Sequence, residues 1–527
     1  MSERYKKLNP TFPDLDKTNG SSLNNPQELK QGILEIISKE DPTSHDEILI
    51  QLLEQFEPLD FYLLAFPEIE HLRAQLETID QESDQANDIR KKLDKKKLNS
   101  KHYLVLSIEN VRTVAEKNRW GLCKNQEFIY LFNGAYWTYI DREAFQKFLG
   151  QASEKMGVPK FMARYYLFRE QLLKQFIASE YLPTPAPSKA AVNINLRNGT
   201  FEVTPTGTNL RSFDRSDFIT YQLPFNYNPE ATAPIFKAYL DKVLPDEESR
   251  KILAEYMGFV FIKHGSKALK EEKALILFGT GANGKSVFFE VVNALLGVKN
   301  VSTYTLQSLT DPNGYYRAMI ANKLVNYASE INGKLETSHF KQLVSGEPVE
   351  ARLPYGRPMQ ITQYAKLIFN CNELPKDVEH TAAYFRRFLI IPFDVTIPEH
   401  EQDKSLHNKI IENELSGVFN WVLEGLNRLL TQKRFSPCDV AKQAVDQYKT
   451  ESDSVKYFIE EMGYANSSSE HQIIKEFYLD YRGFCMEEGL IPVKKTNFIR
   501  RLKGCGVVVE RKNIGYLAYM SKVPIQI

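Results

Sequence analysis

The nine residues FGTGANGKS, from Phe278 to Ser286, are the part of the sequence whose residue types and spacing most directly specify chemistry. They fit the pattern G-x-x-x-x-G-K-[ST]. The glycines let backbone N–H groups turn inward around the β- and γ-phosphates of a nucleotide. The lysine would reach the same phosphate oxygens, and the final hydroxyl would bind Mg²⁺. The pattern therefore predicts a site for a nucleoside triphosphate built from Gly279, Thr280, Gly281, Ala282, Asn283, Gly284, Lys285 and Ser286.

The segments on either side of this motif indicate the elements that must hold it. The apolar run from Ala274 to Phe278 predicts a buried strand, and residues Val287 to Leu296 have apolar side chains at helical spacing. The N-terminus of that helix would add partial positive charge near the phosphates. An ordinary glycine turn is the alternative, but the strand–loop–helix context favours the phosphate-binding interpretation.

Nucleotide hydrolysis also requires an acidic group, a polar residue near the γ-phosphate and a cation for the charge that develops. Glu330 follows one short apolar strand and suits the first role. Asn372 follows a second strand and suits the second role, whereas Asn370, its competitor, is expected to belong to the strand itself. Arg386 and Arg387 precede a third strand. As an arginine finger they would act on a neighbouring subunit's nucleotide, which requires a ring; a plain ion pair is the alternative.

The composition limits the class of protein. A chain of 527 residues is expected to hold several domains. The 67 Lys and Arg residues balance the 67 Asp and Glu residues, so any contact with nucleic acid must come from a local patch or a lined channel. The five cysteines are scattered without zinc-ligand or redox spacing, which predicts reduced thiols. No long apolar run or signal peptide is present, so we expect a cytoplasmic protein without a membrane partner.

The chain before the nucleotide motif is expected to form two regions. Residues 1–101 predict a disordered polar arm, a small helical element and a charged linker. For the charged run RKKLDKKKLNSK, a solvated helix or linker is favoured over a nucleic-acid-binding tail. Residues 102–235 predict an α+β domain, with hairpins at Asn133-Gly134 and Asn198-Gly199 and a long helical stretch from Phe145 to Leu182.

The chain around and beyond the motif predicts an α/β core and a smaller final domain. Residues 236–435 alternate strands and helices, which predicts a largely parallel sheet covered by helices. Ligands collect at the carboxyl ends of such strands, where the motif lies. A hairpin over Pro348 to Ile361 interrupts the alternation. Residues 450–527 predict helices followed by a β-ribbon, similar to a winged helix, with DNA-binding residues Arg500, Arg501 and Lys503.

The segment from Phe278 to about Leu430 resembles the superfamily 3 helicases, in the branch of phage- and plasmid-encoded primase–helicases that includes the poxvirus primase–helicase. Upstream, INLRNGT and DFITYQLPFNYNP are similar to the domain that precedes the ATPase in that branch. The motifs that carry the resemblance occur in the family's order and spacing: GTGANGKS, ASE at 328–330, KQLVSGEPVEARLPYGRP at 341–358, FNCNELP at 369–375 and YFRRFLIIPF at 384–393.

The resemblance implies an AAA+-like P-loop ATPase that uses ATP and Mg²⁺. Such proteins work as homo-hexameric rings that move 3′ to 5′ along single-stranded or forked DNA, here for replication of a phage, plasmid or other mobile element. By motif, Lys285 and Ser286 correspond to the Walker A pair and Glu330 to the Walker B acid. Asn372 corresponds to sensor 1, and Arg387 matches the arginine finger better than its neighbour does.

In this family, the hairpin between the acid and the sensor faces the central channel. Here it would present Arg352, Tyr355 and Arg357, a mixture of cations and an aromatic ring suited to phosphates and bases. Lys341 is expected to join this DNA-binding surface. An exposed loop without a ligand is the alternative.

The sequence departs from the family in two places. The residue before the Walker B acid is Ser329 rather than a second acid, so metal coordination would rest on Ser286 and Glu330. Fused relatives carry a primase–polymerase domain with clustered metal-binding carboxylates, whereas this chain offers only Asp14 and Asp16 in a polar arm. We therefore expect no primase activity, and a separate primase and polymerase as partners in a bacterial or phage-infected cell.

Two other functions remain as alternatives. An origin-binding replication initiator would use the C-terminal segment to mark or melt a site, with ATP mainly as an assembly switch. Residues Thr496 to Lys503 and the pair Arg511-Lys512 favour this alternative. A nucleotide-driven machine acting on protein is the other, and the basic and aromatic hairpin argues against it.

Overall fold

The computed structural model of the chain describes residues 43–125, 127–180, 191–329, 331, 336–354, 356–375, 378, 380–490 and 492–522. The polar arm predicted at the N-terminus lies outside these residues. No helix in the described part of the chain is both long and apolar enough to cross a membrane. All five cysteines are described, and all are free thiols.

Most helices in the first described part of the chain pack around one hydrophobic core, to which the helices at residues 68–78 and 84–94 contribute no residue. The predicted helical stretch from Phe145 to Leu182 is helical in most of its described residues, but it is divided into three helices, because Gly157 turns the chain with φ of +101° and Pro159 follows. In the charged run, residues 90–94 end a mostly exposed helix and residues 96–99 form a loop before the next helix, in agreement with the prediction of a solvated helix or linker. The helices are α2 His45–Gln55, α3 Phe61–Ala65, α4 Glu68–Thr78, α5 Asp84–Asp94, α6 Ser100–Lys117, α7 Arg142–Lys155, α8 Lys160–Arg164 and α9 Tyr166–Ser179.

Two small antiparallel sheets, with strand orders β1-β2-β3 and β4-β5-β6, carry the predicted hairpins. The second hairpin turns through Arg197 and Asn198, one residue before the predicted pair, and Gly199 begins β5 with φ of +145°. The outer strands β1 and β6 were not predicted. The strands are β1 Gly121–Asn125, β2 Phe128–Phe132, β3 Trp137–Ile140, β4 Val192–Leu196, β5 Gly199–Thr204 and β6 Gly207–Arg211.

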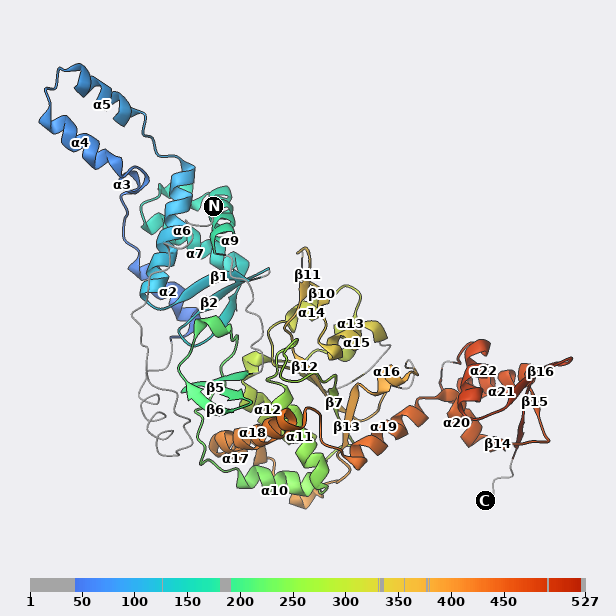
Figure 1. Cartoon of the computed structure of the whole chain (residues 1–527). Helices are drawn as coiled ribbons and strands as arrows, with labels where there is room; N and C mark the ends of the chain where they lie inside the picture. The colour runs from blue at the N-terminus through green and yellow to red at the C-terminus, as the bar shows by residue number, and fades with distance from the viewer. Residues whose placement is uncertain are drawn as a thin grey trace. The chain divides into compact units, whose positions relative to one another are not determined.

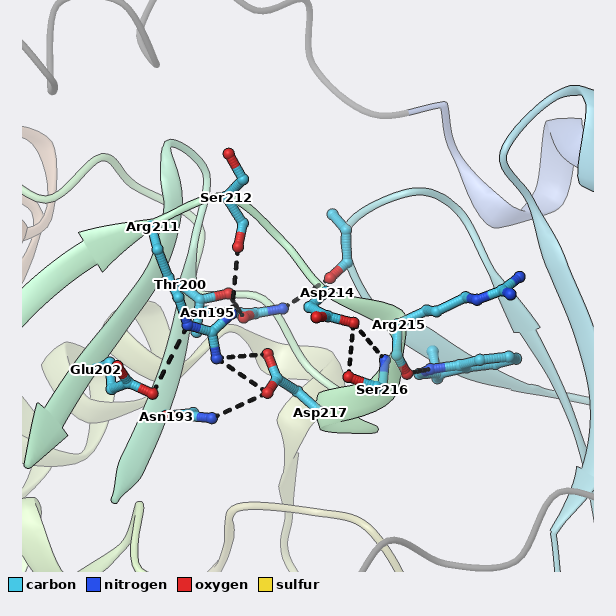
Figure 2. A network of polar contacts seen from close by, with 12 residues as sticks. Asn193, Asn195, Thr200, Glu202, Arg211, Ser212, Asp214, Arg215, Ser216 and Asp217 are labelled. Atoms are coloured by element: carbon cyan, nitrogen blue, oxygen red, sulfur yellow. Dashed lines mark hydrogen bonds and ion pairs between the residues drawn. The ribbon is translucent and has the colours of Figure 1, made fainter. Parts of the chain in front are cut away.

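A polar network fixes a short 3-10 turn, η2 (Arg215–Asp217), beside the second of these sheets (Figure 2). Arg211 donates from Nη2 to both carboxylate oxygens of Asp217, at 2.9 and 2.7 Å. Asn193 donates from Nδ2 to the same carboxylate at 3.2 Å. The charge of Asp217 is therefore neutralised by its own sheet, and the direction of the chain after the turn is fixed.

A five-stranded parallel sheet with the order β13-β7-β12-β9-β8, here called the central sheet, is the largest sheet in the described part of the chain; Figure 1 labels its strands β7, β12 and β13. Every neighbouring pair in it is parallel, as the alternation of strands and helices predicted. The short edge strand β8 was not predicted. The strands are β7 Ala274–Phe278, β8 Val301–Ser302, β9 Val325–Ala328, β12 Lys366–Cys371 and β13 Phe388–Pro392.

Helices surround this sheet and its core. Residues of β7, β12, α13, α15 and α19 share one hydrophobic cluster, while α11 packs closely against α18. Helix α19 packs against β13 and buries Tyr448, although its residues lay between two predicted domains. The helices are α10 Pro234–Val243, α11 Glu247–Phe259, α12 Lys285–Leu296, α13 Leu306–Thr310, α14 Tyr315–Met319, α15 Thr337–Ser345, α16 Ala382–Phe385, α17 Leu406–Asn413, α18 Leu415–Gln432 and α19 Asp439–Glu451; η3 Val298–Asn300 and η4 Glu399–Glu401 are short 3-10 turns.

The remaining elements are a hairpin and a small C-terminal unit. The hairpin pairs β10 (Val349–Arg352) with β11 (Pro358–Ile361), as predicted. The C-terminal helices and strands share a hydrophobic core of their own, and their similarity to a winged helix stays a prediction. They are α20 Ser454–Glu461, β14 Tyr464–Asn466, β15 Gln472–Ile473, α21 Ile474–Glu487, α22 Lys495–Gly504, β16 Val509–Lys512, β17 Gly515–Ala518 and β18 Met520–Lys522.

Candidate nucleotide-binding site

The loop between β7 and α12 has a backbone that its glycines make possible. Gly279 and Gly284 have φ of +155° and +87°, and Ala282 lies in the left-handed region at +58°. A Cβ added at Gly279 would lie 2.4 Å from the carbonyl oxygen of Phe393, and one added at Gly284 would lie 2.8 Å from Cγ1 of Val243. Both positions therefore require glycine for backbone conformation and for space.

The backbone N–H groups of this loop are available to a ligand. None of the N–H groups of residues 280–286 donates a hydrogen bond to an acceptor within the described part of the chain. They lie at the N-terminus of α12, where the helix dipole contributes partial positive charge. Successive unpaired N–H groups at a helix N-terminus form a binding site for phosphate oxygens.

Lys285 lies within the loop. Its Nζ donates to the carbonyl oxygens of Gly279, at 2.5 Å, and Thr280, at 3.1 Å, and to Oδ1 of Asn283 at 3.0 Å. Burial lowers the pKa of the Lys285 ammonium, and nearby Cys371 opposes that shift. The ammonium thus contacts neutral oxygens, and an anionic phosphate would attract it more strongly than they do.

Three contacts hold the loop against the rest of the core. Asn283 donates from Nδ2 to the carbonyl oxygen of Phe393 at 2.8 Å. Tyr239 donates its hydroxyl to the carbonyl oxygen of Gly284 at 2.8 Å. The backbone N–H of Ile397 donates to the carbonyl oxygen of Ala282 at 2.8 Å. The segment after β13 and helix α10 therefore fix the loop before any ligand binds.

A cavity of about 440 Å³ adjoins the loop at the carboxyl edge of the sheet. Ser286 lines it together with Ser329, Asn370 and Asn372, so the structure brings these predicted residues to one place. Glu330, the predicted acid, lies outside the described residues. Other lining residues were missed from the sequence, because they come from α10, the segment after β13 and the first residue of α17: Tyr239, Lys242, Val243, Ile397, Glu401, Gln402, Asp403, Lys404 and Leu406.

The two asparagines of this edge differ in environment. Asn370 lies in β12 and accepts a hydrogen bond through Oδ1 from the hydroxyl of Tyr327 at 2.9 Å. Asn372 lies just past the strand and is exposed in the cavity wall. The expectation that Asn370 belongs to the strand is correct. Both asparagines line the cavity, and the role of Asn372 stays a prediction.

Arg386 and Arg387, the two candidates for the arginine finger, differ in their exposure and contacts. Arg387 has only 9% of its side chain exposed and donates to the carbonyl oxygen of Ala383 at 2.6 Å and to Oγ of Ser345 at 2.8 Å. It also lies 3.2 Å from a carboxylate oxygen of Glu272. Arg386 has 64% of its side chain exposed and pairs with the same carboxylate. In this single chain, Arg386 is thus the more accessible cation.

The hairpin presents the predicted cations to solvent. Arg352, the last residue of β10, and Arg357, just before β11, are both exposed. Arg352 donates from Nε to the carbonyl oxygen of Gly356 at 3.0 Å, which stabilises the turn. Tyr355 lies outside the described residues. Lys341 lies on α15 and is half-buried.

The predicted basic residues of α22 divide into two groups. Arg500 and Lys503 are exposed. Arg501 has 17% of its side chain exposed and lies 3.2 Å from a carboxylate oxygen of Asp453. Arg501 therefore joins α22 to the start of α20, a structural contact that the DNA-binding prediction did not include.

The donors present fit the phosphates of a nucleotide. The loop N–H groups and Lys285 supply hydrogen bonds and charge, and Ser286 lines the cavity. The described residues contain no group of three or more acidic, His or Cys side chains that could hold a metal by themselves. Mg²⁺ usually binds through few protein ligands together with phosphate oxygens and water. Ser286 could therefore hold Mg²⁺ once a nucleotide supplied phosphate oxygens.

Two protein families match parts of this chain. The family described as D5 N terminal like matches residues 115–245. A family of unknown function, DUF5906, matches residues 277–387, which include the loop, β9, the hairpin and β12. The first match runs from the end of α6 to just past α10, and the second runs from within β7 to the residue before β13, so residues 246–276 belong to neither.

The chain is also similar to two viral proteins named as helicases. "Putative helicase 121R" of Invertebrate iridescent virus 3 is 22% identical over 357 residues, which are 59% of this chain and 37% of that protein. "Putative helicase L207/L206" of Acanthamoeba polyphaga mimivirus is 25% identical over 171 residues, 31% of this chain and 17% of that protein. This chain thus spans well under half the length of either relative.

Among solved structures, the apo NrS-1 C terminal region matches 77% of this chain and 87% of its own length. The TM-score is 0.43 at 14% identity, a level from which nothing about this chain follows. The similarity to helicase-named proteins therefore rests on the sequence matches.

Proposed function

We propose that the chain is an ATP-dependent DNA helicase that moves along single-stranded DNA, 3′ to 5′, during replication of a phage, plasmid or other mobile element. The observation that carries the proposal is the row of unpaired N–H groups at residues 280–286 around Lys285, beside a cavity of about 440 Å³. The similarity to viral proteins named as helicases selects this activity among the many that use a phosphate loop.

In this proposal, each residue of the cavity has a stated role. The loop and Lys285 bind the β- and γ-phosphates, and Ser286 with Glu330 holds Mg²⁺. Asn372 hydrogen-bonds the γ-phosphate or the attacking water from the neighbouring strand. The exposed Arg352 binds the DNA backbone from the β10–β11 hairpin.

The cation for the transition state would come from the adjacent subunit of a homo-hexamer. Arg387 is the residue that matches the family motif, but its bonds to Ser345 and Glu272 would first have to be exchanged. Arg386 already extends into solvent and shares Glu272. Mixing Lys285→Ala chains with Arg387→Ala chains should restore part of the ATPase activity, because intact loops and intact arginines then meet at some interfaces. If Arg386 supplies the cation instead, mixing with Lys285→Ala chains should restore ATPase activity to the Arg386→Ala chain and not to the Arg387→Ala chain.

Strand displacement on forked DNA tests the proposal. The full chain should hydrolyse ATP faster with single-stranded DNA and should displace a strand from a fork with a 3′ tail. Lys285→Ala should abolish both activities, while Lys147→Ala, at an exposed lysine of α7, should leave them unchanged. An ATPase that DNA does not stimulate and that displaces no strand would refute the helicase proposal.

The C-terminal unit favours a second candidate, an origin-binding initiator. The β16–β17 hairpin exposes Arg511, which lies 5.9 Å over the ring of Tyr516, and α22 exposes Arg500 and Lys503. Removing residues 450–527 distinguishes the candidates. A helicase should still displace a generic fork, whereas an initiator should lose its sequence-specific binding and all DNA-dependent activity.

A further inference from the structure

A second cavity lies at the edge of the central sheet opposite the phosphate loop. It adjoins the first residue of β12, Lys366, and residues 321–324 before β9, whereas the loop follows the last residue of β7. Its volume is about 80 Å³, several times the space that one water molecule needs. Nothing in the proposed helicase mechanism uses this cavity.

The floor of the cavity holds a buried cation. Lys366 has 8% of its surface exposed, and its Nζ lies 3.1 Å from Nδ1 of His264 and 4.2 Å from the ring centre of Phe259. Among the ion pairs between described residues, none includes Lys366. A buried ammonium without an anionic partner is costly, because neither an imidazole nor an aromatic ring replaces its lost hydration fully.

His264 is neutral in this arrangement. Its Nε2 lies 3.1 Å from the carbonyl oxygen of Tyr364, so Nε2 carries the proton and Nδ1 accepts a hydrogen bond from Lys366. Burial and the charge of Lys366 both lower the pKa of His264 well below its usual value. Gln363 fixes this residue by hydrogen bonds to its backbone N–H and carbonyl groups.

The described residues that line this cavity include no carboxylate. Lys263, which is exposed, and Lys323, which is half-buried, add two further cations at its rim. Lys263 donates to the backbone carbonyl oxygen of Asp217 at 3.1 Å. The carboxylate of Asp217 is occupied by Arg211 (Figure 2), so it does not balance the charge of the cavity.

The wall of the cavity is held in a strained shape. Two lining residues, Phe218 and Asn322, have left-handed backbones with φ of 47° and 58°. Asn322 donates from Nδ2 to the hydroxyl of Tyr130 at 2.5 Å and accepts at its carbonyl oxygen from Thr220 at 3.3 Å. Strained residues of this kind persist where the surrounding contacts hold them, and they concentrate at ligand sites.

We propose that this cavity binds a phosphate group, either free inorganic phosphate or the end of a phosphomonoester, with Lys366 as its central ligand. A phosphate dianion would supply the partner that the buried ammonium lacks, and lysine binds phosphate as a point charge. Lys263 and Lys323 at the rim would attract the anion, and the amide of Asn322 would add a neutral donor.

Phosphate binding by the full chain tests the proposal directly. Inorganic phosphate and glycerol 3-phosphate are titrated separately by calorimetry into the Lys285→Ala chain, which weakens the phosphate loop as a competing site. Saturable binding of at least one of them is expected. Lys366→Met should weaken that binding at least tenfold, and the matched surface control Lys147→Met should leave it unchanged. The anion that binds more tightly identifies the source of the phosphate.

A second readout does not depend on the folding of the Lys366 variant. Phosphate at a saturating concentration should slow acetylation of the exposed Lys263, measured by peptide mass, and should not slow acetylation of Lys147. Lys263→Ala should weaken binding about threefold. Absence of saturable binding of both anions, or binding that Lys366→Met leaves unchanged, would overturn the proposal, as would equal acetylation of Lys263 with and without phosphate.

Discussion

Replacing Lys366 by methionine is expected to stabilise the chain at neutral and acidic pH. Burial lowers the pKa of the Lys366 ammonium from 10.5 to about 7. The unfolded chain therefore binds more protons than the folded chain between these two pH values. The free energy of unfolding must then rise with pH over that window, and the full cost of the buried charge is present below pH 7. Methionine has a similar length and carries no charge to bury.

The magnitude follows from the size of the pKa shift. At about 1.4 kcal/mol per pKa unit, burying the charge costs up to about 5 kcal/mol below pH 7. The substitution also removes the hydrogen bond to Nδ1 of His264, which costs roughly 1–2 kcal/mol. Lys366→Met should thus gain roughly 3 kcal/mol below pH 7. That gain should disappear, and become a small loss, near pH 10.

Protection of the β9 and β12 backbone amides against hydrogen exchange measures this difference locally, which suits a chain of several domains. The other titratable groups that line the cavity are the same in both chains. Burial lowers the pKa of His264 in both chains, although Lys366→Met removes the further lowering by the Lys366 charge, and burial raises the pKa values of Tyr130, Tyr221 and Tyr364. A stability difference between the two chains that does not change from pH 6 to pH 10 would refute the reasoning. So would a Lys366→Met chain that is less stable at pH 6.

Three further predictions concern other parts of the chain. Gly284→Ala should weaken ATP binding at least tenfold, measured by calorimetry, because its Cβ would lie 2.8 Å from Val243 and the backbone has φ of +87°; unchanged affinity would contradict this. Arg352→Ala should reduce the slope of log affinity against log salt for single-stranded DNA by about 0.7, the value for one phosphate contact; an unchanged slope would exclude that contact. Glu255→Ala should lower unfolding stability by about 3–5 kcal/mol in denaturant titration, because it leaves Arg428, now 2.6 Å from a fully buried carboxylate, without its partner; a loss below 1 kcal/mol would contradict this.

Local patterns in the sequence predicted those elements whose cause is local. The motif at 279–286 predicts a tight loop whose glycines adopt positive φ values. Gly279 and Gly284, in the loop between β7 and α12, have such values. The first Asn-Gly pair formed its hairpin, and the second turned one residue early. The alternation of apolar runs predicted the parallel sheet. By contrast, β8 has two residues and α13 has five, too few for a periodic pattern.

What the tertiary structure decided is which distant residues meet. The strand before the loop places the loop at the carboxyl edge of the sheet. The part of the cavity lined by Lys242 and Glu401, however, comes from one segment that precedes β7 in the chain and another that follows β13. Lys366 and His264 are separated by 102 positions and carry no motif. The register of β12 beside β9, together with the packing of Phe259, buries them side by side. A buried lysine is not visible in a sequence, because its burial depends on every element packed around it.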